Sequence, residues 1–134
     1  MLLRSGGDRS ARRTVGDGLL SLRKLPPLSR GADERVHLVE KKDVALTKGA
    51  EFLGGFNNSD ISDRRYCTKC GSHISVDHPT LGLIDVRIGA LRNFPFKPNV
   101  HLNYAETILP MKDSLPKLKN FPAEIGGSGE TLPE

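Results

Sequence analysis

Two cysteines, Cys67 and Cys70, are the residues whose type and spacing most clearly suggest chemistry in this sequence. They lie in the pentapeptide Cys67-Thr68-Lys69-Cys70-Gly71. Two thiolates separated by two residues can chelate one zinc ion at about 2.3 Å from each sulfur, and the glycine after them permits the tight turn that this geometry needs. A structural zinc site normally has four ligands, but the chain has only 2 cysteines. The motif therefore predicts half of a zinc site, with Cys67 and Cys70 as metal ligands.

Three other interpretations of the cysteine pair remain open. His73 and His78 could complete a finger-like site, although only two residues separate Cys70 from His73, where a classical finger has about twelve. A thioredoxin-type redox pair would lie between a strand and a helix, whereas Gly71 is followed by a strand-like segment. The two thiols could also stay reduced and bind nothing. We favour half of a zinc site whose other half is missing or supplied elsewhere.

Short strands are expected to position this motif. After residue 36, apolar segments alternate with turn signals at roughly 8–12-residue spacing, which is typical of antiparallel β proteins. No segment there shows the long 3.6-residue apolar period of a capped helix. The fold class predicted from the sequence is therefore mainly β. The strands are expected near residues 36–38, 44–46, 51–56, 65–67, 73–77, 83–88 and 100–104, with polar turns at 41–43, 57–60 and 78–82.

The histidines and the charged residues near them are expected to have ordinary structural roles. His101 lies in an expected strand and should be packed or line a pocket rather than bind a metal. His78 precedes a proline and should be a turn residue, and His73 should lie on a polar strand face. Asp85 and Arg87 alternate outward on their strand, so we expect a solvated face there.

The net charge of +4 belongs to the first part of the chain. Residues 1–35 contain eight basic and four acidic residues, whereas residues 36–134 contain twelve of each. All seven aromatic residues also lie after residue 36. Residues 1–35 have too little apolar surface to offset the entropy of ordering them. We therefore expect them to form a disordered basic leader, followed by one small domain.

Two other functions of the leader are less well supported. A mitochondrial presequence is poor in acidic residues, but Asp8, Asp17 and Asp33 interrupt the basic residues here. A polyanion-binding arm would contact phosphates through arginines, yet no aromatic residue is interleaved for base stacking. No nucleic-acid partner is therefore expected. No apolar run reaches the ~18–20 residues of a membrane span, so no membrane partner is expected either.

The cysteine motif and the segments after it resemble the glutathione-dependent formaldehyde-activating enzyme family, also called the Gfa-like or centromere-protein-V domain. The knuckle itself reads Tyr66-Cys67-x-x-Cys70-Gly71-Ser72-His73. The resemblance covers roughly residues 43–134, the C-terminal portion of the family domain, and rests on a series of segments in the same order and spacing. These segments are residues 46–51, 77–79, 82–86, 101–107, 115–117 and 122–130.

The resemblance implies a β-tent-like zinc fold of short antiparallel strands, here truncated. Family members hold a structural zinc with four cysteines, an early C-x-C pair and a later CxxC that Cys67 and Cys70 match. A C-x-C-x-x-C cluster between them holds a second, catalytic zinc. The implied activity is carbon–sulfur lyase chemistry, which joins formaldehyde to glutathione. Zinc is thus the implied cofactor, and glutathione or another small thiol adduct is the implied partner.

This chain departs from the family at its metal sites. No cysteine precedes Cys67, so five of the seven family cysteines have no counterpart, and no catalytic or cofactor-binding residue is carried over. We expect a Gfa-like zinc protein that is inactive as this chain stands. An altered start or a frame disruption upstream of about residue 36 would explain the missing cysteines and the charge step together. The alternative is a non-catalytic zinc/thiol interaction module, in which a homodimer could share a four-cysteine site.

The expected organisation follows from these points. Residues 1–35 form the leader, residues 36–120 a partial Gfa-like domain, and residues 121–134 a Gly/Pro-rich tail with little to bury. A truncated sheet with unpaired edges is expected to be marginally stable. A reduced CxxC pair and the lack of a convincing export signal favour a cytoplasmic location.

Overall fold

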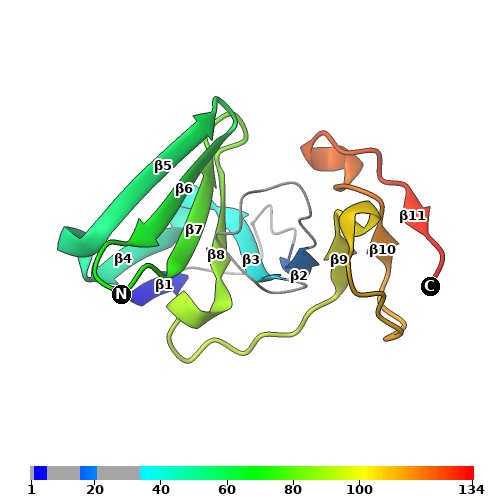
Figure 1. Ribbon diagram of the computed structural model, residues 1–134, viewed down its shortest axis with the longest axis horizontal. Coiled ribbons are helices and arrows are strands. Elements are labelled where there is room, and N and C mark those ends of the chain that lie inside the picture. The colour runs from blue at the N-terminus through cyan, green and yellow to red at the C-terminus, as the bar shows by residue number, and fades with distance from the viewer. Residues whose placement is uncertain (1, 6–15, 21–33) are drawn as a thin grey trace. The chain divides into compact units, whose positions relative to one another are not determined.

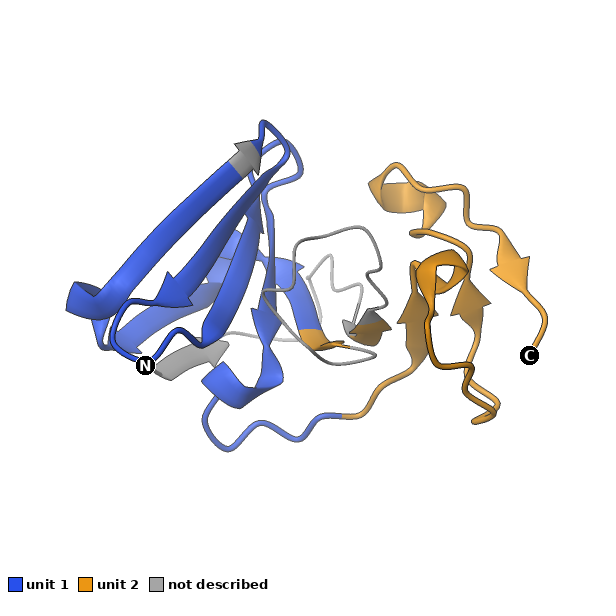
Figure 2. Ribbon diagram, viewed as in Figure 1, with its two compact units in different colours: residues 1–16, 37–96 blue, residues 17–36, 97–134 orange. Residues whose placement is uncertain are grey.

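The computed structural model describes residues 2–5, 16–20 and 34–134 and has a mainly β architecture (Figure 1). This confirms the predicted fold class. In the described ranges, every helix is a single 3-10 turn of three residues. The chain divides into two compact units, which Figure 2 shows in different colours: unit 1 comprises residues 1–16 and 37–96, and unit 2 comprises residues 17–36 and 97–134.

Unit 1 is built around an antiparallel meander of four strands. β5 (Leu53–Ser59), β6 (Ser62–Cys67), β7 (His73–His78) and β8 (Leu83–Arg87) each pair with the next strand along the chain. β3 (Glu34–Glu40), which belongs to unit 1 from His37 onward, follows β8 in the strand order. β4 (Val44–Lys48) pairs antiparallel with β1 (Leu2–Ser5) in a separate two-stranded sheet.

The apolar core of unit 1 lies directly beside the cysteine motif. Cys67, the last residue of β6, is itself a core residue with 7% exposure. The other buried members of this cluster are Val39, Ile74, Ile84, Val86, Ala90 and Leu91. The 3-10 turn η4 (Ile88–Ala90) contributes one of them. The start of the motif is therefore fixed by core packing, because a buried side chain at this position holds the end of β6 in place.

Unit 2 is a smaller, mixed arrangement of short strands. β9 (Val100–Leu102) pairs in parallel with both β2 (Gly16–Leu20) and β10 (Lys117–Leu118), and β10 pairs antiparallel with β11 (Thr131–Leu132). Val36 and Leu102 form its small buried core. Two 3-10 turns, η5 (Tyr104–Glu106) and η6 (Ala123–Ile125), lie between the strands.

Two stretches of the expected disordered leader form strands. Most of residues 1–35 lies outside the described residues, but β1 pairs with β4 and β2 pairs with β9. Leu19 of β2 is buried. Disorder was expected because the leader cannot form a core by itself, whereas these short strands take their backbone hydrogen bonds from strands later in the chain. These two stretches are therefore paired with strands later in the chain.

The expected strands after residue 36 are present with shifted ends. Residues 51–56 were expected to begin a strand, but η3 (Ala50–Phe52) comes first and β5 begins at Leu53. The expected turn at 57–60 lies partly inside β5, where the backbone N–H of Ser59 donates to Asn57 Oδ1 at 3.0 Å and the register shifts. The local hydrogen bond between Ser59 and Asn57, which favours a turn, therefore coincides with an irregularity in the pairing of β5 with β6.

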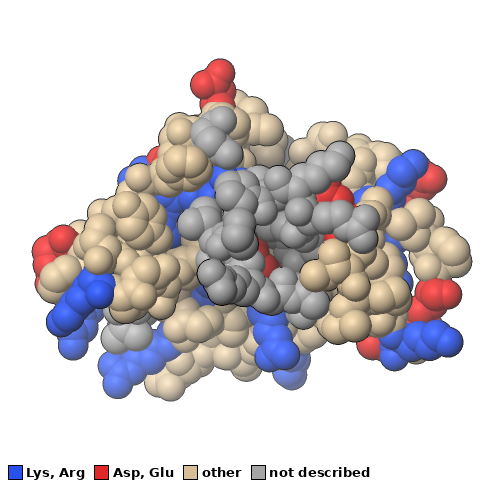
Figure 3. Space-filling view, in the orientation of Figure 1, with Lys and Arg blue, Asp and Glu red and all other residues tan. Residues whose placement is uncertain are grey.

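The charged side chains of the two units are of both signs. Basic and acidic residues are interspersed on the face shown in Figure 3, in keeping with the equal numbers in residues 36–134. Within the ranges that the structure describes, no helix is long and apolar enough to cross a membrane.

Candidate functional site

The cysteine motif forms a compact turn between β6 and β7. The backbone N–H of Gly71 donates to the carbonyl of Cys67 at 2.7 Å, and the N–H of Cys67 donates to the carbonyl of Ser72 at 2.8 Å. Gly71 has a φ of +77°, a left-handed conformation that glycine adopts without a steric penalty. The N–H of Thr68 donates to the carbonyl of Phe52 at 2.8 Å and so attaches the turn to η3. The sequence thus encodes the turn locally, through the glycine after the second cysteine.

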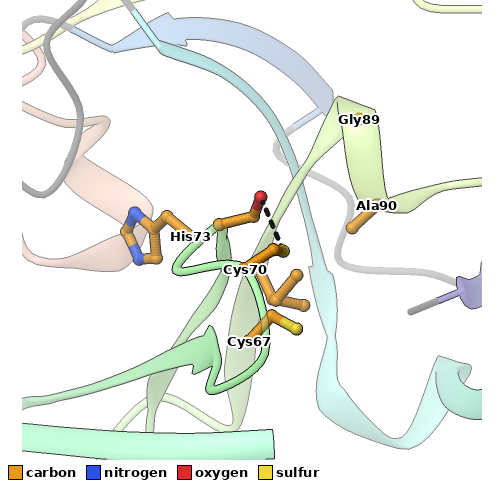
Figure 4. A pocket seen from close by; sticks show the side chains of 7 residues that line it. Cys67, Cys70, His73, Gly89 and Ala90 are labelled. Atoms are coloured by element: carbon orange, nitrogen blue, oxygen red, sulfur yellow. Dashed lines mark hydrogen bonds between the residues drawn. The ribbon is translucent and has the colours of Figure 1, made fainter. Parts of the chain in front are cut away.

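The two cysteine side chains line the same cavity but differ in exposure. Cys67 is buried and Cys70 is exposed, and neither forms a disulfide. Cys70 Sγ lies 3.2 Å from Ser72 Oγ, the contact drawn as a dashed line in Figure 4. Hydrogen bonds from Ser72, first from its side chain and then from its backbone, and a further one from the Cys67 thiol lower the pKa of Cys70 to about 7. Cys70 is therefore substantially ionised near neutral pH, and the thiolate is the form that binds metals.

A cavity of about 370 Å³ adjoins the two thiols within unit 1 (Figure 4). The cysteine turn, the start of β7 and the turn η4 form its walls. The lining residues are Cys67, Cys70, Ser72, His73, Ile74, Gly89 and Ala90. A volume of this size is within the range of small-ligand pockets, so a small molecule could approach the exposed thiol.

His73 lies beside the cysteine turn but its imidazole is engaged elsewhere. The Nε–H of Arg87 donates to His73 Nδ1 at 3.3 Å. A guanidinium has only donors, so Nδ1 of His73 is the acceptor in this contact. Figure 4 shows the ring turned away from both cysteine sulfurs. The prediction that His73 lies on a polar strand face agrees with this arrangement.

His78 is also committed to another partner. Its Nε2 lies 3.0 Å from Asp85 Oδ2. Burial opposes protonation of this histidine, but the hydrogen bond and the charge of Asp85 outweigh it and raise the pKa of His78 above its usual value. Neither His73 nor His78 is placed as a third ligand, and the residues that the structure describes contain no group of three His, Cys, Asp or Glu side chains able to hold a metal. The finger-like interpretation is therefore not supported.

The expectation of a solvated face at Asp85 and Arg87 is wrong. Asp85 is buried, and Arg87 Nη1 donates to its Oδ1 at 3.3 Å. The side chain of Arg87 retains only 11% of its exposure. Strand alternation predicted that these side chains point away from Ile84 and Val86. Their ion pair and the contacts with His73 and His78 allow Asp85 to be buried and Arg87 to be partly buried.

Unit 2 contains a second polar cluster, which sequence reasoning missed. Lys117 is buried, and its Nζ donates at 3.0 Å to each of Asp113 Oδ1, Leu115 O and Glu134 Oε1. His101 is buried as predicted, and its Nε2 lies 2.7 Å from Asp113 Oδ2. All three ammonium protons are thus used. The four-residue spacing of Asp113 and Lys117 places opposite charges near each other in the sequence. The ion pair between Lys117 and Glu134, in contrast, depends on tertiary structure.

The cysteine pair fits two corners of a tetrahedral zinc site. Both thiols belong to one tight turn and line the same cavity. The sequence has no third cysteine, so one chain does not supply a four-cysteine site. Ligands that match the family's C-x-C-x-x-C cluster are absent from the sequence as well, so a catalytic zinc of that type does not fit this chain.

Comparison with known protein families gives no match to this chain, and no curated protein matches it. The resemblance to the Gfa-like family therefore stays a prediction from the motifs.

Proposed function

We propose that this chain is a Gfa-like zinc-binding domain protein of the carbon–sulfur lyase type, which binds metal through Cys67 and Cys70 and has no lyase activity as it stands. The observation that carries the proposal is that both cysteines lie on one turn, closed by Gly71, and line the same cavity. Chelation by two thiolates two residues apart requires such a turn. The proposed family rests in addition on the segments after residue 43, which resemble family segments in the same order.

The residues around the thiols support metal binding at this position. Ser72 hydrogen-bonds to the Cys70 sulfur and stabilises its thiolate. Cys67 is held by the core of unit 1, so one ligand is preorganised, whereas Cys70 is exposed and can adjust to a metal. A preorganised first ligand lowers the entropic cost of forming the site.

The absence of activity follows from the cysteine inventory. A lyase zinc with an open position would polarise a carbonyl or bind a thiolate, but this chain lacks the cysteines that match the family's catalytic cluster. The cavity beside Cys70 is the place we propose for glutathione or another small thiol adduct. We also propose a cytoplasmic location, since reducing conditions keep both thiols available for metal.

Metal analysis of the purified, reduced protein tests this function. We expect bound zinc that is lost in Cys70→Ser and retained in His78→Gln, because only the cysteines are ligands. We also expect no zinc-dependent condensation of formaldehyde with glutathione above the spontaneous rate. Absence of zinc from the wild-type protein would refute the metal assignment, and a zinc-dependent rate would refute the inactivity.

A non-catalytic zinc/thiol interaction module is the second candidate function. The specific observation in its favour is the exposure of Cys70, which leaves one ligand of an incomplete site accessible from outside the fold. The two candidates predict the same metal ligands and differ in what completes the coordination of the metal.

A further inference from the structure

We propose that unit 2 contains a binding site for the carboxylate of a small organic acid, which the side chain of Glu134 occupies in this structure and from which an external carboxylate can displace it. Three donors converge there on one oxygen atom. Nζ of Lys117 lies 3.0 Å from Oε1 of Glu134, and the backbone N–H groups of Asp113 and Ser114 donate to the same oxygen at 2.7 Å each. The proposal does not depend on metal binding, because both cysteines belong to unit 1.

Two successive backbone N–H groups form one side of this site. Ser114 has a φ of +62°, a left-handed conformation that is unfavourable for a residue with a Cβ atom. In this conformation its N–H and the N–H of Asp113 donate to the same atom. Consecutive N–H groups that converge in this way form an anion-binding concavity, because their partial positive charges act together. The backbone of residues 113–114 is therefore arranged to bind an anion.

The ammonium group of Lys117 forms the other side of the site. The lysine side chain retains only 1% of its exposure, so water and salt screen its attraction for an anion less than they would at the surface. A hydrogen bond in which donor or acceptor is ionised is also roughly twice as strong as a neutral one. Hydrogen bonds from the backbone of Ser114 and from Lys117 accordingly lower the pKa of Glu134. The site thus favours the ionised carboxylate.

The donors are held by contacts that do not involve Glu134. Nζ of Lys117 also donates to Oδ1 of Asp113 and to the carbonyl oxygen of Leu115, both at 3.0 Å. Oδ2 of Asp113 lies 2.7 Å from Nε2 of the buried His101. The N–H of Leu115 donates to Oδ1 of Asp113 at 3.1 Å. These contacts position both the lysine and the segment 113–115, so the site is preorganised for a replacement carboxylate.

The occupant, in contrast, is exposed and lightly attached. The side chain of Glu134 retains 40% of its exposure, and Pro133 before it is exposed as well. The preceding strand, β11, has two residues, of which Leu132 pairs with Lys117 of β10. A tethered ligand competes at an effective concentration on the order of millimolar or more. An external carboxylate at a higher concentration can therefore take its place.

The charges at the site fit a singly charged carboxylate. Lys117 also forms an ion pair with Asp113, so part of its charge is already neutralised. A ligand with two negative charges would need a further cation to offset its desolvation. Glu134, the group seen in the site, carries a single carboxylate. Acetate carries the same group without the tether and is therefore the probe that we choose.

Chemical rescue of a variant that lacks the occupant tests the site. In the full-length chain, Glu134→Ala should lower the thermal midpoint by on the order of 5 °C. Sodium acetate at about 100 mM should restore most of this loss, because it binds the folded state, whereas sodium chloride at the same ionic strength should not. In two-dimensional NMR spectra of the variant, the amide signals of Asp113 and Ser114 should shift and reach saturation as acetate is added.

Further variants make the rescue specific. Adding Lys117→Met to Glu134→Ala removes the cation and should abolish the rescue. Glu130→Ala is the matched control, because Glu130 and its partner Lys119 are both exposed, and acetate should not stabilise this variant. If Glu134→Ala does not fold, Glu134→Gln, which keeps the side-chain volume without the charge, is titrated with acetate in its place.

The outcomes separate binding at this site from a general effect of salt. Equal rescue by chloride, or rescue that persists without Lys117, would overturn the site, because charge screening would then explain the result. Rescue by inorganic phosphate but not by acetate would overturn the assignment to carboxylates. Amide signals of Asp113 and Ser114 that do not move with acetate would also overturn the proposal. These results leave the proposed function untouched, since it rests on unit 1.

Discussion

The Nζ atom of Lys117 lies 3.0 Å from Oε1 of Glu134, seventeen residues later in the chain, and the lysine side chain retains only 1% of its exposure. The same carboxylate oxygen accepts hydrogen bonds from the backbone N–H groups of Asp113 and Ser114, each with an N···O distance of 2.7 Å. This contact joins the end of the chain to β10 and to the segment before it. Much of the order of unit 2 therefore depends on charged groups rather than on its small apolar core.

Replacing Lys117 by methionine is expected to destabilise unit 2. The methionine fills part of the space, but it leaves the carboxylates of Asp113 and Glu134 without their cation, and an ion pair broken on one side is costly. We expect the thermal midpoint to fall by on the order of 5 °C. Lys119→Met is the matched control, because Lys119 and its partner Glu130 are both exposed. An equal loss in the two variants would contradict this role for Lys117.

Unit 2 is expected to lose stability in acid. Although burial opposes ionisation, hydrogen bonds from His101 and Lys117 hold the pKa of Asp113 well below its usual range. Hydrogen bonds from the backbone of Ser114 and from Lys117 also lower the pKa of Glu134. The folded state therefore binds protons less readily than the unfolded state, and stability falls as the pH drops below about 4.

Denaturant unfolding at several pH values between neutrality and acid checks this prediction. Asp113→Asn should be less stable than the wild type at neutral pH and should show a flatter dependence below pH about 4. The wild-type and variant curves should therefore converge in acid. Parallel curves would show that this carboxylate does not contribute to the acid transition.

Cys70 is expected to be the more reactive thiol in the metal-free protein. It is exposed, whereas Cys67 is buried, and hydrogen bonds led by the Ser72 side chain lower its pKa to about 7. Its alkylation rate should therefore rise with pH and level off above that value, since the thiolate is the nucleophile. Ser72→Ala should move the midpoint to higher pH, as followed by iodoacetamide labelling and mass spectrometry. An unchanged midpoint would exclude Ser72 as its cause.

Gly71→Ala is expected to strain the cysteine turn. Nothing lies within 4 Å of the added Cβ, but φ is +77°, so the cost is conformational and amounts to about 1 kcal/mol. Gly89→Ala is the matched control, because its Cβ also meets open space and its backbone is not left-handed. Chemical denaturation should show a loss in the first variant and little change in the second. Similar losses would mean that the turn tolerates a side chain at position 71.

Local patterns predicted the parts of this protein in which neighbouring residues decide the structure. Alternating apolar residues identified β7 and β8, and glycine after the second cysteine identified the turn of the motif. The mainly β class follows from those signals. The resemblance to a zinc-binding family also rests on short local motifs. The assignment of Cys67 and Cys70 as metal ligands remains a prediction.

Contacts between distant residues escaped this reasoning. Asp85 was expected in solvent because strand alternation describes one strand at a time, whereas its burial depends on Arg87 and on His78 of the neighbouring strand. β1 and β2 were not expected because their hydrogen-bond partners lie in later strands. Partners distant in sequence leave no periodic signal, so only a folded chain reveals them.

The sequence by itself determined the cysteine motif, its glycine turn, the number of available thiols and the β class, because each depends on residue type and short-range spacing. Tertiary structure decided that Cys67 is buried while Cys70 is exposed, that His73 and His78 are engaged with Arg87 and Asp85, and that Lys117 meets Glu134. The physical reason is that burial and ion pairing depend on which side chains fold against one another. Spacing along the chain specifies which candidate side chains are near one another in sequence. Packing specifies which of them are buried, exposed or engaged with another side chain.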